Sequence, residues 1–165
     1  AGNKEIIRYL KFNLRSQIFA KSLTMPMVIG GLKRLELLRT RPEIKAKLWE
    51  NVEKLQGGLK KIGYNLGDTN TCVTPVFIQG NPVEAMLLAR DLRENYGIFT
   101  SVVSYPVIPK GMILLRLIPT ASHTDAEINE TLEAFEGIYK KLETGYYKEL
   151  EAQQIKEQNL QFKEI

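Results

Sequence analysis

The sequence predicts an α/β (α+β) fold in which N-terminal helices precede a small β-α-β-β-α domain. Up to residue 62, apolar residues recur at intervals of three and four, as in amphipathic helices. Beyond residue 63, β-branched runs alternate with Gly, Pro and Asn, as in short strands joined by turns. The 165 residues are 44% hydrophobic and 25% charged, which suits one domain with a core of its own.

Three helices are expected in the N-terminal part. Residues 3–19 carry an apolar stripe opposite Lys and Arg, which predicts one amphipathic helix. Residues 22–32 are nearly uncharged and contain adjacent glycines, so a turn followed by a buried helix to Leu38 is predicted. Pro42 begins the next helix, which carries a continuous apolar stripe, and Gly63 ends it.

Three strands are expected in the C-terminal part. Residues 72–78 form the first, and Pro75 within it favours a sheet edge or a bulge because proline cannot donate a ladder hydrogen bond. Residues 97–104 and 111–118 form the other two, joined by a proline-rich loop.

Two helices cover this sheet. Asn81 caps a helix that runs to about Asn95, with proline in its first position. Thr124 opens a capping box, and the apolar stripe that follows it extends to Leu142. Residues 144–165 are polar with sparse apolar positions, which leaves a marginal helix or a disordered tail as alternatives.

Composition excludes several classes of function. Lys and Arg number 23 and Asp and Glu 19, and the two signs are interspersed, so the net charge of +4 does not argue for nucleic acid. Cys72 is the single cysteine and His123 the single histidine, which excludes an internal disulfide and a Cys/His metal site. Neither a membrane-spanning run nor a targeting signal is recognised, so a cytoplasmic location is expected.

Arg116 is the most informative candidate residue. It interrupts the apolar run 112–118, where an unpaired charge would cost several kcal/mol, so an anion is expected to meet it. A guanidinium suits a carboxylate because it can donate two parallel hydrogen bonds. The alternative is a strand edge at which Arg116 reaches solvent or pairs with an internal Asp or Glu.

Four other residues are weaker candidates. His123 precedes a helix, where it is either a base or a capping or packing residue. Ser22 and Thr24 precede a helix start, where their hydroxyls either bind phosphate or cap the helix. Lys110, held between Pro and Gly, either meets an anionic partner such as a coenzyme phosphate or is a solvated turn residue.

Four sequence strings carry a resemblance to a known family. In order, they are residues 19–23 (FAKSL), 47–51 (KLWEN), 105–111 (YPVIPKG) and 115–124 (LRLIPTASHT). Together they resemble the C-terminal part of the α-oxoamine synthases, which are pyridoxal-phosphate (PLP) enzymes of the class I/II aminotransferase fold. The string YPVIPKG is most similar to glycine C-acetyltransferase, also called 2-amino-3-ketobutyrate coenzyme A ligase.

The resemblance covers roughly residues 1–143 and implies a domain organisation. Residues 1–38 are expected to be the end of the large PLP domain and residues 39–62 an interdomain helix. Residues 63–143 are expected to form the small C-terminal domain with a mainly antiparallel sheet, as in fold-type I PLP enzymes. The polar tail, 144–165, lies outside the resemblance.

The resemblance also implies an activity for the parent enzyme. It would be a homodimer that uses PLP to condense glycine with acetyl-coenzyme A to 2-amino-3-oxobutyrate, and to run the reverse in threonine breakdown. Arg116 matches the arginine that binds the amino-acid carboxylate. Ser22 matches the hydroxyl that reaches the cofactor phosphate across the dimer. Serine palmitoyltransferase, or another α-oxoamine synthase, is the alternative within the family.

One family motif is missing from the chain. The Schiff-base lysine stands in a Ser/Thr-x-Ser-Lys motif, which this sequence does not contain. We therefore expect a C-terminal fragment that neither holds the cofactor covalently nor turns over substrate, with no catalytic residue and no metal of its own. The alternative of another class is a non-catalytic dimerisation or interaction module, in which Arg116 is paired internally.

Overall fold

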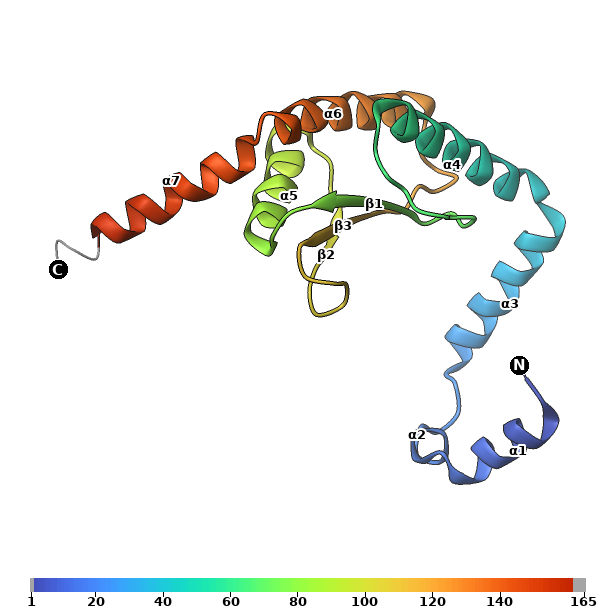
Figure 1. Cartoon of the computed structure of the whole chain (residues 1–165). Helices are drawn as coiled ribbons and strands as arrows, with labels where there is room; N and C mark the ends of the chain where they lie inside the picture. The colour runs from blue at the N-terminus through green and yellow to red at the C-terminus, as the bar shows by residue number, and fades with distance from the viewer. Residues whose placement is uncertain (1, 162–165) are drawn as a thin grey trace. The chain divides into compact units, whose positions relative to one another are not determined.

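A computed structural model describes residues 2–161 (Figure 1). The chain divides between Pro42 and Glu43 into two compact units. Each unit is described by itself. The helices of the first unit are α1 (Lys4–Asn13), α2 (Arg15–Ile18) and α3 (Met25–Thr40). The second unit contains α4 (Pro42–Ile62), β1 (Thr74–Gln79), α5 (Pro82–Tyr96), β2 (Ser101–Val103), β3 (Met112–Leu117), α6 (Asp125–Glu143) and α7 (Tyr146–Gln161). No helix of the described chain is long and apolar enough to cross a membrane.

The first unit begins with two short helices where one was predicted. α1 is capped by Asn3, whose side chain accepts a hydrogen bond from the backbone of Glu5. The helix ends because Leu14 takes an extended conformation, with ψ of 108°. At this end the side-chain amide of Asn13 donates a hydrogen bond to the backbone carbonyl of Tyr9. The prediction of a single helix over residues 3–19 is therefore wrong.

α3 confirms the predicted helix but not its burial. None of its residues is buried, and Met27 and Leu32 are 64% and 62% exposed. Apolar side chains lie on several sides of this helix, and no second layer of the first unit packs over them. The prediction of a buried helix is therefore wrong for the described chain.

The second unit is built on a three-stranded antiparallel sheet in the order β1-β3-β2, with the predicted β-α-β-β-α sequence of elements. β3 is the middle strand, and its Arg116 stands opposite Pro75 on β1 and Ser101 on β2. Pro75 therefore lies on an edge strand, as predicted. β2 is shorter than the predicted 97–104, because Gly97 ends α5 in a left-handed conformation and a turn begins at Ser104.

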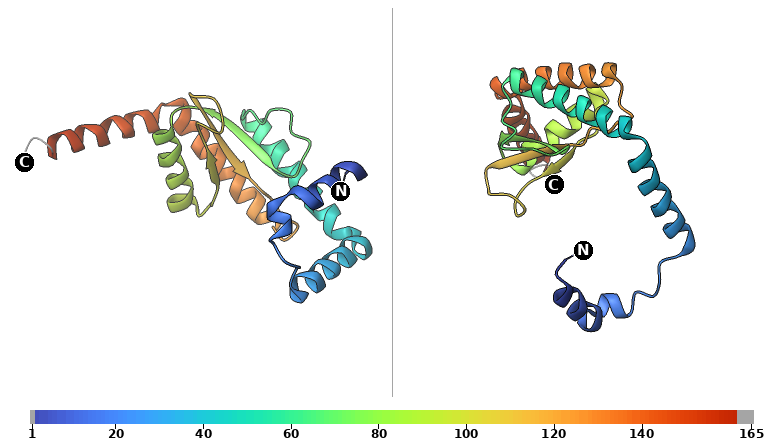
Figure 2. Two further views of the ribbon diagram at one scale, coloured as in Figure 1. Left: turned by 90° about the horizontal axis from the view of Figure 1, so that it is seen from below. Right: turned by 90° about the vertical axis from the view of Figure 1, so that its right-hand side faces the viewer.

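One face of the sheet is covered by helices α4, α5 and α6 (Figures 1 and 2). Side chains alternate across each strand, so every second residue enters this core. Strand residues in the core include Val76, Ile78, Ile113, Leu115 and Leu117. They meet helix residues that include Leu55, Leu59, Leu88, Leu92, Phe135 and Ile138. No helix of this unit lies on the other face, within the described residues.

The tail after Thr144 is helical as far as Gln161, and a buried polar cluster docks it. Tyr147, which is 2% exposed, donates a 2.6 Å hydrogen bond to Asp91 on α5. Lys141 on α6 pairs with the same carboxylate at 2.7 Å, and Asn95 donates to its second oxygen. Asp91 therefore joins three helices through one side chain.

Acid is expected to weaken this junction. Burial raises the pKa of Asp91, but hydrogen bonds from Asn95, Lys141 and Tyr147 outweigh it and hold the pKa below its ordinary value of 3.8. The carboxylate thus stabilises the folded chain above that value, and this contribution is lost as the pH falls through the lower folded-state pKa. Between neutral pH and about pH 2, the free energy of unfolding measured with urea should fall more steeply for the native chain than for Asp91→Asn. Equal pH dependence of the two would contradict this.

Candidate substrate-binding site

Arg116 lies on the sheet face that the helices leave open, and its side chain is exposed. Its expected place within a buried apolar run is wrong, because burial alternates along β3 and position 116 points outward. The alternative placed Arg116 at a strand edge, which is wrong since β3 is the middle strand, but its expectation that Arg116 reaches solvent is met. No carboxylate among the described side chains pairs with Arg116, so the internal ion pair is not found there either. The guanidinium is open to an external anion.

The first residue of β2 and the residue before it hold Arg116 in place. Its Nε donates a 3.1 Å hydrogen bond to Oγ of Ser101, the residue directly opposite. Its backbone carbonyl accepts from the hydroxyl of Thr100 at 3.4 Å. On the same open face, Leu114 and Phe77 are half-buried and stand opposite each other. The site is therefore a fixed cation beside an apolar floor.

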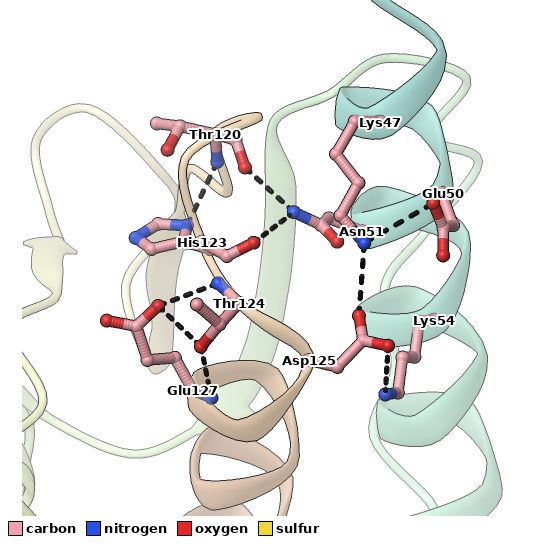
Figure 3. Close-up of polar contacts among 9 residues, drawn as sticks. All are labelled: Lys47, Glu50, Asn51, Lys54, Thr120, His123, Thr124, Asp125 and Glu127. Atoms are coloured by element: carbon pink, nitrogen blue, oxygen red, sulfur yellow. Dashed lines mark hydrogen bonds and ion pairs between the residues drawn. The ribbon is translucent and has the colours of Figure 1, made fainter. Parts of the chain in front are cut away.

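The loop after β3 is tightly hydrogen-bonded (Figure 3). The backbone N–H of Thr120 donates to Nδ1 of His123 at 3.0 Å, so in the neutral imidazole the proton is on Nε2. Thr124 and Glu127 form the predicted capping box at the start of α6. Hydrogen bonds from the backbone and hydroxyl of Thr124 lower the pKa of Glu127. His123 therefore serves the loop, while the capping of α6 falls to Thr124.

Asn51 ties this loop to α4, and sequence reasoning gave it no role. Its Nδ2 donates to the carbonyls of Thr120 and His123, both at 2.9 Å, and the residue is fully buried. Its Oδ1 is buried without a partner among the described residues. A polar residue on the apolar stripe of this helix, three positions after Leu48, was the available signal.

An exposed ion-pair group lies beside Asn51 (Figure 3). The carboxylate of Asp125 forms ion pairs with Nζ of Lys47, at 3.1 Å, and with Nζ of Lys54, at 3.8 Å. These pairs connect the start of α6 to α4. The hydrogen bond with Lys47 lowers the pKa of Asp125 and raises that of Lys47. These contacts support the loop from its outer side.

The remaining candidates lie elsewhere. Thr24 is the N-cap of α3 but makes no side-chain capping bond, and Ser22 is exposed with no recorded hydrogen bond. The capping alternative is therefore not seen for these hydroxyls, which belong to the first unit. Lys110 is exposed and lies 5.0 Å from the centre of the Tyr105 ring, a cation–π contact within the proline-rich loop.

A hollow of about 410 Å³ lies beside the loop and is lined by residues that include Phe99, Ile118, His123 and Glu127. Arg116 is not among its lining residues. The described residues contain no cluster of three or more His, Cys, Asp or Glu side chains able to hold a metal ion. What the geometry offers is anion binding at Arg116 next to apolar surface.

Comparisons with known proteins identify the family of the chain. The family model for aminotransferase class I and II matches residues 1–135. A cysteate-C-fatty acyltransferase of Capnocytophaga ochracea is 62% identical over 157 residues, which are 95% of this chain and 37% of that protein. An 8-amino-7-oxononanoate synthase of Fervidobacterium nodosum is 35% identical, over 86% of this chain and 35% of that protein.

A solved structure of SPT with its PLP internal aldimine matches at a TM-score of 0.73 and 27% identity. It covers 84% of this chain and 35% of that one. The chain thus spans little more than a third of the proteins that it matches. Because the family model matches residues 1–135, the chain belongs to the class I and II aminotransferase family, and these relatives support the α-oxoamine synthase resemblance within it.

Proposed function

We propose that this chain is the carboxylate-binding part of a PLP-dependent enzyme that transfers a fatty acyl group from a thioester to an amino acid. The observation that carries the proposal is Arg116, an exposed guanidinium without a carboxylate partner among the described side chains. Such a group grips a carboxylate through two charge-assisted hydrogen bonds. Cysteate is the first amino acid to test, because of the 62% identical relative.

The residues present fit part of a cofactor site. The hydroxyls of Ser22 and Thr24 stand before α3 and make no hydrogen bond within the described residues, which leaves them open to a phosphate. PLP, when bound, supplies an electron sink for the carbanion formed at the amino-acid α-carbon. In the full-length homodimer, Ser22 reaches the phosphate in the neighbouring site. Residues 1–38 belong to the cofactor domain, 39–62 join the domains, and 63–143 form the small domain.

The acyl group is the finer question. The string YPVIPKG favours glycine and acetyl-coenzyme A, as in glycine C-acetyltransferase. The face that carries Arg116 favours a longer chain, because Leu114, Phe77 and Val103 leave apolar surface beside it. We therefore place a fatty acyl donor first and acetyl-coenzyme A second.

The test uses the full-length protein loaded with PLP. Release of coenzyme A is measured for palmitoyl- and acetyl-coenzyme A, each with cysteate, serine and glycine. The highest kcat/KM is expected for palmitoyl-coenzyme A with cysteate. Serine with palmitoyl-coenzyme A would instead indicate serine palmitoyltransferase, and glycine with acetyl-coenzyme A would indicate glycine C-acetyltransferase; either outcome overturns the proposed substrate pair. Absence of turnover with every pair would overturn the enzyme proposal in favour of an interaction module.

A further inference from the structure

Ser101 is the residue in closest polar contact with the Arg116 side chain. The two stand opposite each other in the antiparallel pairing of β2 with β3. Their contact runs from Nε of the guanidinium to the serine Oγ, at 3.1 Å. This is the only hydrogen bond recorded for that guanidinium among the described residues.

The choice of nitrogen decides how a ligand can approach. A guanidinium carries five N–H donors in one plane. It can hold a carboxylate side-on, through Nε and one terminal nitrogen, or end-on, through both terminal nitrogens. Because Ser101 occupies Nε, the side-on approach is blocked and the end-on pair of donors is left free.

The backbone of Arg116 is held as well. The hydroxyl of Thr100, the residue before β2, donates to the Arg116 carbonyl. Two consecutive residues, Thr100 and Ser101, thus hold the backbone and the side chain, and the contact at Nε limits rotation of the guanidinium. An arginine held in this way loses less conformational entropy when it binds a ligand.

We propose that Ser101 is a positioning residue that holds Arg116 so that its two terminal nitrogens meet the substrate carboxylate end-on. The inference rests on the proposed function, because it takes the amino-acid carboxylate as the anion bound at Arg116. Ser101 itself does not contact the substrate. Its role is to remove the competing geometry and to hold the plane of the guanidinium.

Two isosteric replacements separate the hydroxyl from the shape of the side chain. Ser101→Thr keeps an oxygen acceptor, whereas Ser101→Val has the same shape as threonine without it, and both suit a strand. In the full-length protein, Ser101→Val is expected to raise the dissociation constant of cysteate about 3- to 10-fold, the size of one hydrogen bond. Ser101→Thr should stay within about 2-fold of the native protein. Equal effects of the two replacements would overturn the proposal.

A double-mutant cycle shows whether Ser101 acts through Arg116. If it does, Ser101→Val adds nothing in an Arg116→Ala background, since the group that it positions is gone. Additive losses would mean that Ser101 acts on the substrate by another route, and would overturn the proposal. Ser101→Val should change KM for the amino acid, while kcat at saturating substrate stays within about 2-fold of the native value.

A readout without activity keeps this inference distinct from the proposed function. With ¹⁵N-labelled arginine in the full-length protein, exchange of the Arg116 Nε–H should quicken in Ser101→Val and not in Ser101→Thr. If the exchange rate is unchanged in both variants, the hydrogen bond between Arg116 and Ser101 is not present in solution and the inference is wrong. If exchange responds as expected but Arg116→Ala leaves cysteate affinity unchanged, then the proposed function fails while the Ser101 contact holds, and the positioning role falls with that function.

Discussion

Arg116→Ala is expected to raise KM of the full-length enzyme for its amino acid about 100-fold, close to 3 kcal/mol of lost binding. The guanidinium is exposed and supplies a fixed positive charge on its sheet face. Alanine removes both N–H donors that are proposed to hold the carboxylate. KM for the acyl thioester should stay within about 3-fold, because the arginine is proposed to meet only the amino acid.

Two further variants control this result. Arg116→Lys keeps the charge but not the two parallel donors, so it should recover only part of the lost affinity. Arg90→Ala removes an exposed arginine from α5, where it pairs with Glu94, and should leave both KM values unchanged. An Arg116→Ala enzyme with native KM for the amino acid would remove the carboxylate-binding role from this residue.

Asn51→Leu is expected to destabilise the second unit by about 2–3 kcal/mol. Leucine keeps the branched shape of the side chain, although it is bulkier, and removes both N–H donors, so the carbonyls of Thr120 and His123 lose their partner. Urea unfolding can be followed by the fluorescence of Trp49, the single tryptophan, which lies on the same helix. Backbone hydrogen exchange in residues 118–124 should quicken at the same time, because the loop loses its tie to α4.

Gln56 supplies a matched comparison on that helix. Its Nε2 also donates to a backbone carbonyl, that of Thr71, but this contact holds the segment before β1. Gln56→Leu should therefore leave exchange in residues 118–124 unchanged while it loosens residues 69–74. Similar exchange profiles for the two variants would show that the loss is a general weakening of α4 and not a release of one loop.

Features specified by neighbouring residues could be predicted from the sequence. Pro42 and Gly63 set the ends of α4, with Gly63 at a φ of 116° that other residues rarely adopt. The N-cap at Asn81 and the capping box at Thr124 formed as expected, because each needs only residues within three positions of each other. The strands and the edge proline also followed from β-branched runs and their punctuation, whereas the antiparallel pairing was expected from the family resemblance.

Features that depend on distant residues could not be predicted in this way. The hydrogen bonds of Asn51 join residues 69 and 72 positions apart, and no local pattern records them. Arg116 was singled out correctly as unusual, but its exposure depends on which face of β3 the helices cover. The break at Leu14 interrupts an apolar stripe that continues on both sides of it, so periodicity alone gave one helix.

The strand order β1-β3-β2 has a consequence for the order in which the chain folds. β1 and β2 do not pair with each other, so neither has a hydrogen-bonded partner strand in this sheet until β3 enters between them. β3 is also the last of the three to leave the ribosome. Arg116 thus sits on the strand that completes the sheet, so the proposed anion site forms only once β3 has paired with both of its neighbours.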